Sequence, residues 1–434
     1  MSTGRHSTGR RNPGDGRAGL ASLRAPAYPS GGYRRSPLVR LRRLIVLVGI
    51  LVVIAGAVQL LRGLPEVRIS PALASDIRLP GAAPSLPWPS SGQATVAVQG
   101  VGSFGSVGGN QPVPIASMAK MMTAQIILTD HPLAPGASGP SIAVDAAAVA
   151  TEKAEAAQFE SVVPVVAGES LTERQALQAL LIPSGNNIAL LLADWDAGNE
   201  AAFVAKMNTE ARALGMTHTH YADTSGFSSA TVSTATDQMK LLKVVMANPV
   251  FAHIVAMPQV TLPVAGLVYN YDYNLGHNGF VGVKTGSDGA AGGCFAFAVD
   301  HRVDGHAYTI LGVVLGQQGK YILQAALNVA TALANAVTTQ VAVRQAVAPG
   351  LTAARLLAPW TTTVAATTRS SASVLGWSGL EVPIHLDVRV SGRRVPANSQ
   401  IGVLEVGQAG ERTAVPVSTT KALASPSLVW KLTR

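Results

Sequence analysis

The 434-residue sequence has little cysteine, little charge and few aromatic residues: Cys294 is its single cysteine, and charged and aromatic residues make up 13% and 5% of the chain. One cysteine excludes any disulfide within the chain, so the fold must rest on its hydrophobic core. That core can be large, because 48% of the residues are hydrophobic and a chain of this length commonly forms two folded units. Cys294 itself is interpreted as a small buried apolar side chain.

Acidic residues are nearly absent from the N-terminal segment. Residues 1–43 contain ten arginines and one acid, Asp15, whereas the rest of the chain holds 23 basic and 23 acidic side chains. The net charge of +9 therefore belongs to this segment, which is also rich in Gly and Ser and is predicted to be disordered. A neutral remainder argues against nucleic acid as a partner, because that function requires a basic face on a folded domain.

An uncharged apolar run at residues 44–61 follows the arginines and is bounded by Arg43 and Arg62. As a helix it would be about 27 Å long, which is enough to cross the hydrocarbon core of a bilayer. The arginines on its N-terminal side predict a cytoplasmic tail and a remainder outside the plasma membrane. A cleaved signal peptide and a buried core helix are the alternatives. A retained single-pass anchor is favoured, since the small-residue site at residues 72–74 lies well beyond the run.

The remaining chain is predicted to form a linker and two folded parts. Residues 62–93 are Pro-rich and are interpreted as a spacer. Residues 94–336 combine strand and helix patterns, whereas residues 337–434 carry short Val- and Thr-rich runs typical of a small all-β domain. The last ten residues are expected to form a strand. Within residues 94–336, a helical middle is preceded and followed by predicted strands at 94–99, 280–286, 294–299 and 308–315, and by a closing helix at 320–336.

The motif Ser117-Met-Ala-Lys120 lies at the start of a predicted helix. The exposed N–H groups of a helix start favour the negative charge that a reacting serine oxygen develops. Lys120 follows one turn later on the same face, so its amine can reach the Ser117 hydroxyl. Burial would lower the pKa of Lys120 and let it accept the serine proton. A second Ser-x-x-Lys match begins at Ser418, but it lacks partner motifs and is interpreted as accidental.

Two further motifs occur downstream in the order Ser184-Gly-Asn186 and Lys284-Thr-Gly286. Thr172 opens a capping-box pattern and Pro183 ends the helix that follows, which predicts that the first motif lies on a turn between two helices. Lys284 is predicted at the end of a strand, where its amine can bind a carboxylate and Gly286 lets a ligand backbone approach. The three motifs together indicate one cleft with a lysine-activated serine.

With their surroundings, these motifs resemble the low-molecular-mass penicillin-binding proteins that act as serine-type D-alanyl-D-alanine carboxypeptidases, peptidase family S11, which are relatives of class A β-lactamases. The resemblance covers about residues 94–336. It implies an α/β (α+β) fold: a β-lactamase/transpeptidase-like catalytic domain with an antiparallel sheet and a helical subdomain, plus the small C-terminal all-β domain. The matching segments are residues 115–124, 180–186, 214–216, 225–226 and 282–286.

The resemblance also implies a reaction. Ser117 would attack the carbonyl between the two D-alanines of a peptidoglycan stem peptide, with Lys120 as its base, and water would hydrolyse the acyl-enzyme. Ser184 and Asn186 would shuttle protons and hold the substrate amide. The terminal carboxylate would be bound by Lys284, Thr285, Gly286 and Ser287, and the backbone N–H groups of Ser117 and Ser287 would form the oxyanion hole.

No cofactor and no metal is predicted, because His218 and His220 have no further ligands at suitable spacing. The Glu-x-x-Leu-Asn pattern that deacylates β-lactamases is missing between the second and third motifs, and its nearest match, at Gln324, lies after Lys284. β-Lactams are therefore expected to be covalent inhibitors rather than good substrates. A weakly catalytic, membrane-anchored penicillin- or peptidoglycan-binding scaffold and, less favoured, a serine β-lactamase are the alternatives. The preferred stem peptide and the balance with endopeptidase activity stay open.

Overall fold

The computed structural model describes residues 36–408 and 412–434. They divide into two compact units. The first contains residues up to Leu64 together with Ser427–Arg434, and the second is Pro65–Pro426.

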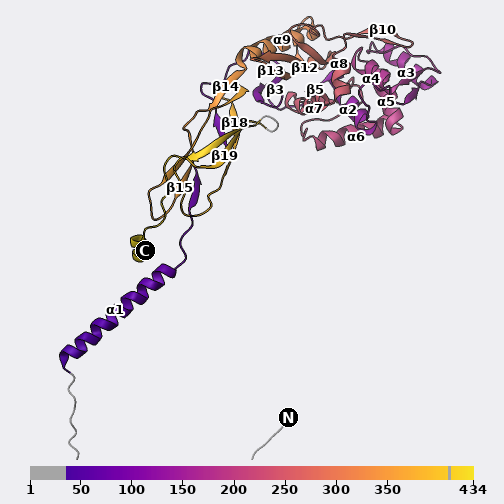
Figure 1. The fold of residues 1–434 in the computed structure, drawn as a ribbon. Coiled ribbons are helices and arrows are strands. Elements are labelled where there is room, and N and C mark those ends of the chain that lie inside the picture. Colours follow the sequence, from indigo (N-terminus) through magenta and orange to yellow (C-terminus); the bar gives the residue numbers. More distant parts are fainter. Residues whose placement is uncertain (1–35, 409–411) are drawn as a thin grey trace, which may run out of the picture. The chain divides into compact units, whose positions relative to one another are not determined.

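The first unit is built on one long apolar helix, α1 (Pro37–Leu61), which is drawn in Figure 1. None of its residues is buried. The short helix α10 (Leu428–Thr433) packs against it, and the Arg434 carbonyl accepts a hydrogen bond from Gln59. Proline favours the first turn of a helix, and α1 accordingly begins at Pro37, so the expectation of disorder is wrong for residues 37–43. The rest of the predicted tail, residues 1–35, lies outside the described residues. The strand expected at residues 425–434 is also wrong, because Ser427 caps α10 by accepting from the Trp430 N–H.

A five-stranded antiparallel sheet forms the centre of the second unit. The predicted strands are all present; β3 has the predicted length, and the other three are longer than the sequence indicated. Their order across the sheet is β11 (Phe280–Asp288), β12 (Gly292–Val303), β13 (His306–Gln317), β3 (Gln93–Val98) and β4 (Gly102–Val107).

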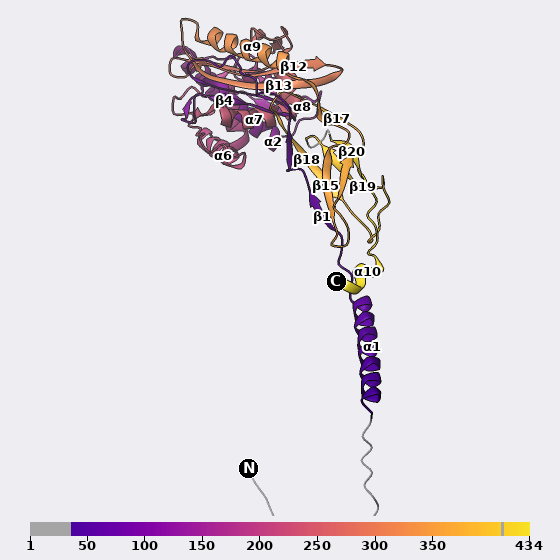
Figure 2. The same ribbon diagram turned by 90° about the vertical axis from the view of Figure 1, so that its left-hand side faces the viewer.

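Both faces of this sheet are covered. Phe295 and Phe297 of β12 point to the face that α9 (Ile322–Gln340) covers, whereas Ala296 and Ala298 belong to the core of the helical subdomain on the other face. Figure 2 shows α9 on one side of β12 and β13, and α6 and α7 on the other. The helices of this subdomain are α2 (Lys120–Asp130), α3 (Ala146–Ala157), α4 (Glu173–Leu181), α5 (Asn186–Ala197), α6 (Glu200–Ala213), α7 (Ala235–Ala247) and α8 (Pro249–Val255).

Short elements complete this part of the chain. They are the 3-10 helix η1 (Ala116–Ala119) and the strand pairs β5 (Val113–Pro114) with β8 (Val232–Ser233), β6 (Ser141–Ala143) with β7 (Ser170–Thr172), and β9 (Gln259–Leu262) with β10 (Gly266–Tyr269). Among the described residues, α1 and α9 are long and apolar enough to cross a membrane. The helix α9 packs on β12 and β13, so its apolar composition is explained by its contact with the central sheet.

The C-terminal region forms a second, β-rich body, as the sequence predicted. Its seven-stranded sheet has the order β1 (Arg68–Pro71), β15 (Thr352–Leu357), β16 (Val364–Thr368), β20 (Thr413–Thr419), β19 (Gln400–Val406), β18 (Glu381–Val388) and β2 (Asp76–Arg78). A separate pair joins β14 (Ala342–Val347) and β17 (Ala372–Gly376). Four residues, 72–75, separate β1 from β2, yet these strands occupy opposite edges, so the sheet must curl round on itself.

The strands β1 and β2 correct the prediction of a spacer at residues 62–93. They pair with β15 and β18, respectively, and close both edges of the sheet. Edge strands tolerate proline, which explains how a Pro-rich segment can contribute them. The two sheets also share a hydrophobic core, in which Phe104 of β4 stacks on Trp377 with ring centroids 3.9 Å apart.

Candidate active site

Ser117 lies in η1, directly before α2, at the point where the chain leaves β5. The sequence predicted an α-helical start, and the structure replaces it by a 3-10 turn. Ala116 enters this turn with a left-handed backbone, φ 45°. Strained residues of this kind concentrate at functional sites. The turn brings the Ser117 Oγ to 2.9 Å from the Lys120 Nζ.

Lys120 is completely buried at the first turn of α2. Besides Ser117, its amine contacts two carbonyl oxygens: the Asn186 Oδ1 at 2.5 Å and the Ser225 backbone oxygen at 3.1 Å. Burial lowers the pKa of Lys120 to about 7, against the opposing effect of nearby carboxylates, chiefly Asp223. A lysine of this kind is neutral in a large fraction of molecules near pH 7 and can act as a base.

The Ser225 carbonyl comes from a loop that Asp223 organises. The Asp223 carboxylate accepts hydrogen bonds from the Gly226 and Phe227 N–H groups, each at 2.8 Å, and from the Thr231 hydroxyl. Gly226 has φ 83°, and a Cβ there would lie 1.8 Å from the Ala116 oxygen. Glycine is therefore required for this loop to approach the nucleophile's turn. The sequence showed Ser225-Gly226 only as part of a resemblance and gave no sign of the lysine contact.

Ser184 and Asn186 lie between α4 and α5, on the interhelical turn that the sequence predicted. The Thr172 capping box that begins α4 is present as well. Ser184 is buried with φ 63°, and Asn186 is the first residue of α5. This tight turn places the Asn186 amide against Lys120 and the Ser184 hydroxyl against Lys284.

Lys284 is buried within β11 and donates to the Ser184 Oγ at 3.0 Å and to the Thr285 carbonyl at 2.8 Å. It was expected at a strand end, but β11 continues to Asp288. Burial, together with the nearby positive charge of Lys120, lowers the pKa of Lys284 well below its ordinary value, and the carboxylate of Asp272 partly offsets this. Asp272 is itself buried, and burial raises its pKa to about 6.

Gly286 brings β11 against the nucleophile. A Cβ on Gly286 would lie 3.1 Å from the backbone nitrogen of Ser117, so a larger residue would push the strand away. The backbone of Ser287 follows directly on this strand edge.

All eight predicted residues are brought together. A cavity of about 270 Å³ is lined by Ser117, Ser184, Thr285, Gly286 and Ser287, and also by Ser161, Tyr271 and Leu323, which sequence reasoning missed. Lys120 and Lys284 lie behind this lining and contact Ser117 and Ser184, respectively. Asn186 contacts Lys120 and, through its backbone N–H, the Ser161 carbonyl.

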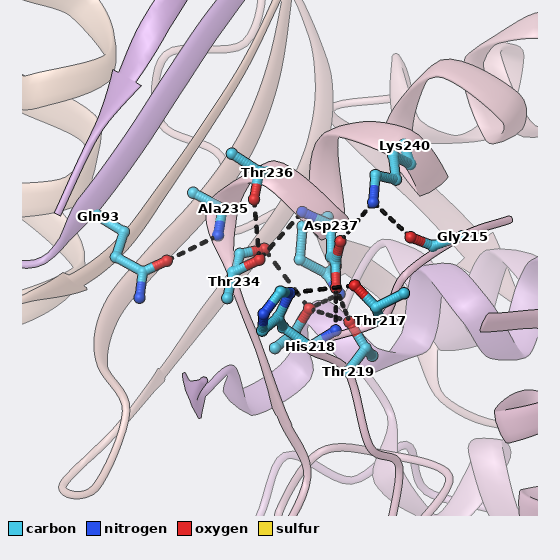
Figure 3. A network of polar contacts seen from close by, with 12 residues as sticks. Gln93, Gly215, Thr217, His218, Thr219, Thr234, Ala235, Thr236, Asp237 and Lys240 are labelled. Atoms are coloured by element: carbon cyan, nitrogen blue, oxygen red, sulfur yellow. Dashed lines mark hydrogen bonds and ion pairs between the residues drawn. The ribbon is translucent and has the colours of Figure 1, made fainter. Parts of the chain in front are cut away.

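A polar network joins the two segments on either side of the Ser225 loop, residues 215–219 and 234–240, as Figure 3 shows. The buried Asp237 carboxylate accepts from the His218 N–H at 2.8 Å, from the Thr219 hydroxyl and from Lys240. The Ala235 N–H donates to Gln93 of β3, which ties α7 to the central sheet. The loop containing His218 is thus attached to α7 through the His218 backbone N–H, which donates to Asp237. Residues 36–408 and 412–434 contain no group of three or more His, Cys, Asp or Glu able to hold a metal ion.

Comparison with known proteins places this site in a family. The family profile described as Peptidase S11, D-alanyl-D-alanine carboxypeptidase, matches residues 106–318. The D-alanyl-D-alanine carboxypeptidase of Streptomyces sp. strain K15 is 31% identical over 220 residues, which cover 46% of this chain and 71% of that protein. The chain belongs to the D-alanyl-D-alanine carboxypeptidase family.

Other relatives match shorter stretches of the chain. DacB2 of Mycobacterium tuberculosis, a D-alanyl-D-alanine carboxypeptidase, is 41% identical over 136 residues, covering 30% of this chain and 46% of DacB2. The D-alanyl-D-alanine endopeptidase of Pseudomonas aeruginosa is 36% identical over 150 residues, covering 35% of this chain and 45% of that protein. The chain thus spans less than half the length of these two relatives.

The crystal structure of the Streptomyces K15 DD-transpeptidase superposes with a TM-score of 0.52 at 25% identity, covering 60% of this chain and all of that one. The central sheet and helical subdomain of the present chain therefore have the transpeptidase-like α/β fold. The family profile ends at residue 318, so the C-terminal β-rich region lies outside it.

Proposed function

We propose that this protein is a serine-type D,D-carboxypeptidase that removes the terminal D-alanine from peptidoglycan stem peptides. The observation that carries the proposal is the buried Lys120 amine, 2.9 Å from the Ser117 Oγ, on a cavity lined by Thr285, Gly286 and Ser287. Relatives of this chain are named carboxypeptidase, endopeptidase and transpeptidase. All three names fit one acyl-enzyme: a carboxypeptidase and an endopeptidase differ in the amine that leaves when it forms, and a transpeptidase releases it with an amine in place of water.

In this mechanism the Ser117 Oγ attacks the carbonyl between the two D-alanines as its proton passes to the neutral Lys120. The tetrahedral oxyanion is received by the backbone N–H groups of Ser117 and Ser287, a donor pair worth about 3 to 4 kcal/mol per lost member. Lys120 then returns this proton by way of the Ser184 hydroxyl, which protonates the leaving amine and also contacts Lys284. Water next attacks the acyl-enzyme and gives a proton to Lys120, which passes it to the Ser117 oxygen as Ser117 leaves.

The substrate carboxylate has a place on the β11 edge. Its negative charge beside Lys284 would favour the protonated lysine and reverse the pKa lowering that burial causes. The Thr285 hydroxyl lines the same cavity and can donate to the carboxylate. A substrate without a free terminal carboxylate is expected to bind more weakly, which favours carboxypeptidase over endopeptidase activity.

The exposed apolar helix α1 supports attachment to the plasma membrane. We propose that it is retained as a single-pass anchor with the N-terminus in the cytoplasm, so that the catalytic unit acts on the cell wall side. Alkaline carbonate should leave the full chain in the membrane pellet, whereas a chain that lacks residues 1–64 should be extracted. Release of the full chain would contradict the anchor.

The test of activity uses the full-length protein in detergent micelles. It is incubated with a peptide ending in D-Ala-D-Ala and, separately, with labelled penicillin. We expect D-alanine release and one covalent label per chain from the wild type, and neither from Ser117→Ala. Ser418→Ala is the matched control, because it removes the serine of the accidental Ser-x-x-Lys motif and should change neither readout.

Three results would point elsewhere. Labelling that persists in Ser117→Ala would refute the assignment of the nucleophile. Penicillin capture without D-alanine release would favour the binding scaffold, and fast turnover of penicillin would favour a β-lactamase.

A further inference from the structure

The segment that follows α3 is fixed onto the start of α5 by four hydrogen bonds. The Glu160 Oε2 accepts from the Asn186 Nδ2 at 2.5 Å, and the Ser161 carbonyl accepts from the Asn186 N–H at 2.7 Å. Val163 exchanges two bonds with the side chain of Asn187, at 2.9 and 2.8 Å. Glu160 is thus held beside the amide that contacts Lys120.

The end of α3 explains how Glu160 reaches this place. The Phe159 N–H donates to the Ala156 carbonyl and the Glu160 N–H to the Glu155 carbonyl, which is the Schellman pattern of a helix end. Phe159 occupies the position at which glycine is usual, with φ 60° and a side chain that is 98% exposed. The exposed Phe159 side chain makes no packing contact that would offset this backbone strain. We therefore interpret the turn by its effect on the next residue, Glu160, which it directs toward Asn186.

Glu160 determines which way the Asn186 amide faces. An ionised carboxylate can only accept hydrogen bonds, so it selects the Nδ2 side of the amide. The Oδ1 side must then face Lys120, as the structure has it. An asparagine without this neighbour could present either side.

The direction of the amide decides where the Lys120 lone pair points. A neutral lysine amine has two N–H bonds and one lone pair. Of its three neighbours, the Asn186 Oδ1 and the Ser225 carbonyl can only accept, so they take both N–H bonds. The lone pair is left for the third neighbour, the Ser117 Oγ, which is the atom that must lose a proton.

We propose that Glu160 is a positioning residue that, by holding the Asn186 amide, aims the lone pair of Lys120 at Ser117. The inference rests on the proposed acyl-enzyme reaction of that same site. With the amide reversed, its Nδ2 would take the lone pair, and Lys120 would present an N–H to Ser117. The general base would then be present but would face the wrong way.

The test separates this role from simple electrostatics. Glu155 and Glu160 both stand near Lys120 and raise its pKa, but the Glu155 Oε2 has no hydrogen-bond partner. At either position Gln removes one negative charge and Lys replaces it by a positive one. Burial, together with the charge of Glu160, raises the pKa of Glu155 to about 7, so the Glu155 charge is fully present only above that pH. Electrostatics alone predicts that both sets of variants move the acid limb of the rate profile to lower pH and keep the plateau.

The measurement is the second-order rate of labelling of the full-length protein by penicillin, from pH 5.5 to 9 as an approximate range around the lysine pKa. We expect the plateau to fall about tenfold in Glu160→Gln, which permits both amide orientations, and about a hundredfold in Glu160→Lys, which can only donate. Glu155→Gln and Glu155→Lys should keep the wild-type plateau. Thermal unfolding of each variant checks that it is folded.

The outcomes are distinct. A wild type that penicillin does not label would refute the proposed function rather than this role of Glu160. Plateaus of the folded Glu160 variants that match those of the Glu155 variants would overturn the positioning role. The same conclusion would follow if the Glu160 variants changed only the position of the acid limb.

Discussion

At the scale of single residues, the pKa of Lys120 makes the reaction depend on pH. Below about pH 7 the buried amine takes up a proton and loses the lone pair that Ser117 requires. The rate of labelling by penicillin should therefore rise tenfold per pH unit below about 7 and level off above it. Lys120→Arg keeps a proton at every accessible pH and should lower the plateau about a thousandfold, within the usual range for loss of a general base.

Lys153→Arg is the control for this experiment. Lys153 is an exposed lysine on α3, so its replacement should leave both the plateau and the acid limb where they are in the wild type. An acid limb near pH 10, the ordinary range of lysine, would mean that burial does not perturb Lys120 in the working enzyme.

The sequence predicted those site residues whose role depends on the chemical type of their own side chain. Ser117, Lys120 and Lys284 are specified by residue type and spacing, and the structure brings them to one cavity and its walls. Ser225 could not be found in this way, because it contributes a backbone carbonyl that any residue would offer. Glu160 was missed for another reason: it lies in the segment after α3, and its partner, Asn186, is 26 positions away at the start of α5.

At the scale of elements, Gly226 lets the Ser225 loop pack directly against η1. Gly226→Ala would place a Cβ against the Ala116 oxygen, where the available gap is 1.8 Å. We expect this variant to lose about 3 kcal/mol or more of stability and most of its acylation rate, because the backbone must move.

Gly266→Ala separates the clash from the cost of a left-handed backbone. Gly266 has φ 67° but open space around its Cβ position, so this variant should lose only about 1 kcal/mol and keep its activity. Chemical unfolding measures both differences, and penicillin labelling measures the activity. Equal losses in the two variants would show that the contact with Ala116 is unimportant.

Elements with a strong local signal were predicted well. The capping box at Thr172 and the alternating run of β3 specify their structure within a few residues. The strands β1 and β2 were missed because they are only four and three residues long and owe their form to partners in a distant part of the chain. Short edge strands of this kind carry no periodicity of their own to read.

At the scale of the whole molecule, the segment before the catalytic domain is part of the fold. Residues 65–78 precede the central sheet in the chain, yet they close the two edges of the C-terminal sheet. The C-terminal sheet is in turn joined to the central one through the core around Phe104 and Trp377. The β-rich region is thus complete only when the chain on both sides of the catalytic domain is present.

This arrangement predicts how shortened chains behave. A chain that begins at residue 65 keeps β1 and β2, whereas one that begins at residue 79 leaves β15 and β18 with unpaired edges. We expect the shorter chain to unfold about 5 °C or more below the longer one in calorimetry. It should also associate at high concentration in size-exclusion chromatography, because exposed strand edges pair with one another. Penicillin labelling of its folded fraction should match that of the longer chain, because the cavity lies on the other sheet. Equal unfolding temperatures of the two chains would show that residues 65–78 do not stabilise the C-terminal sheet and act only as a spacer.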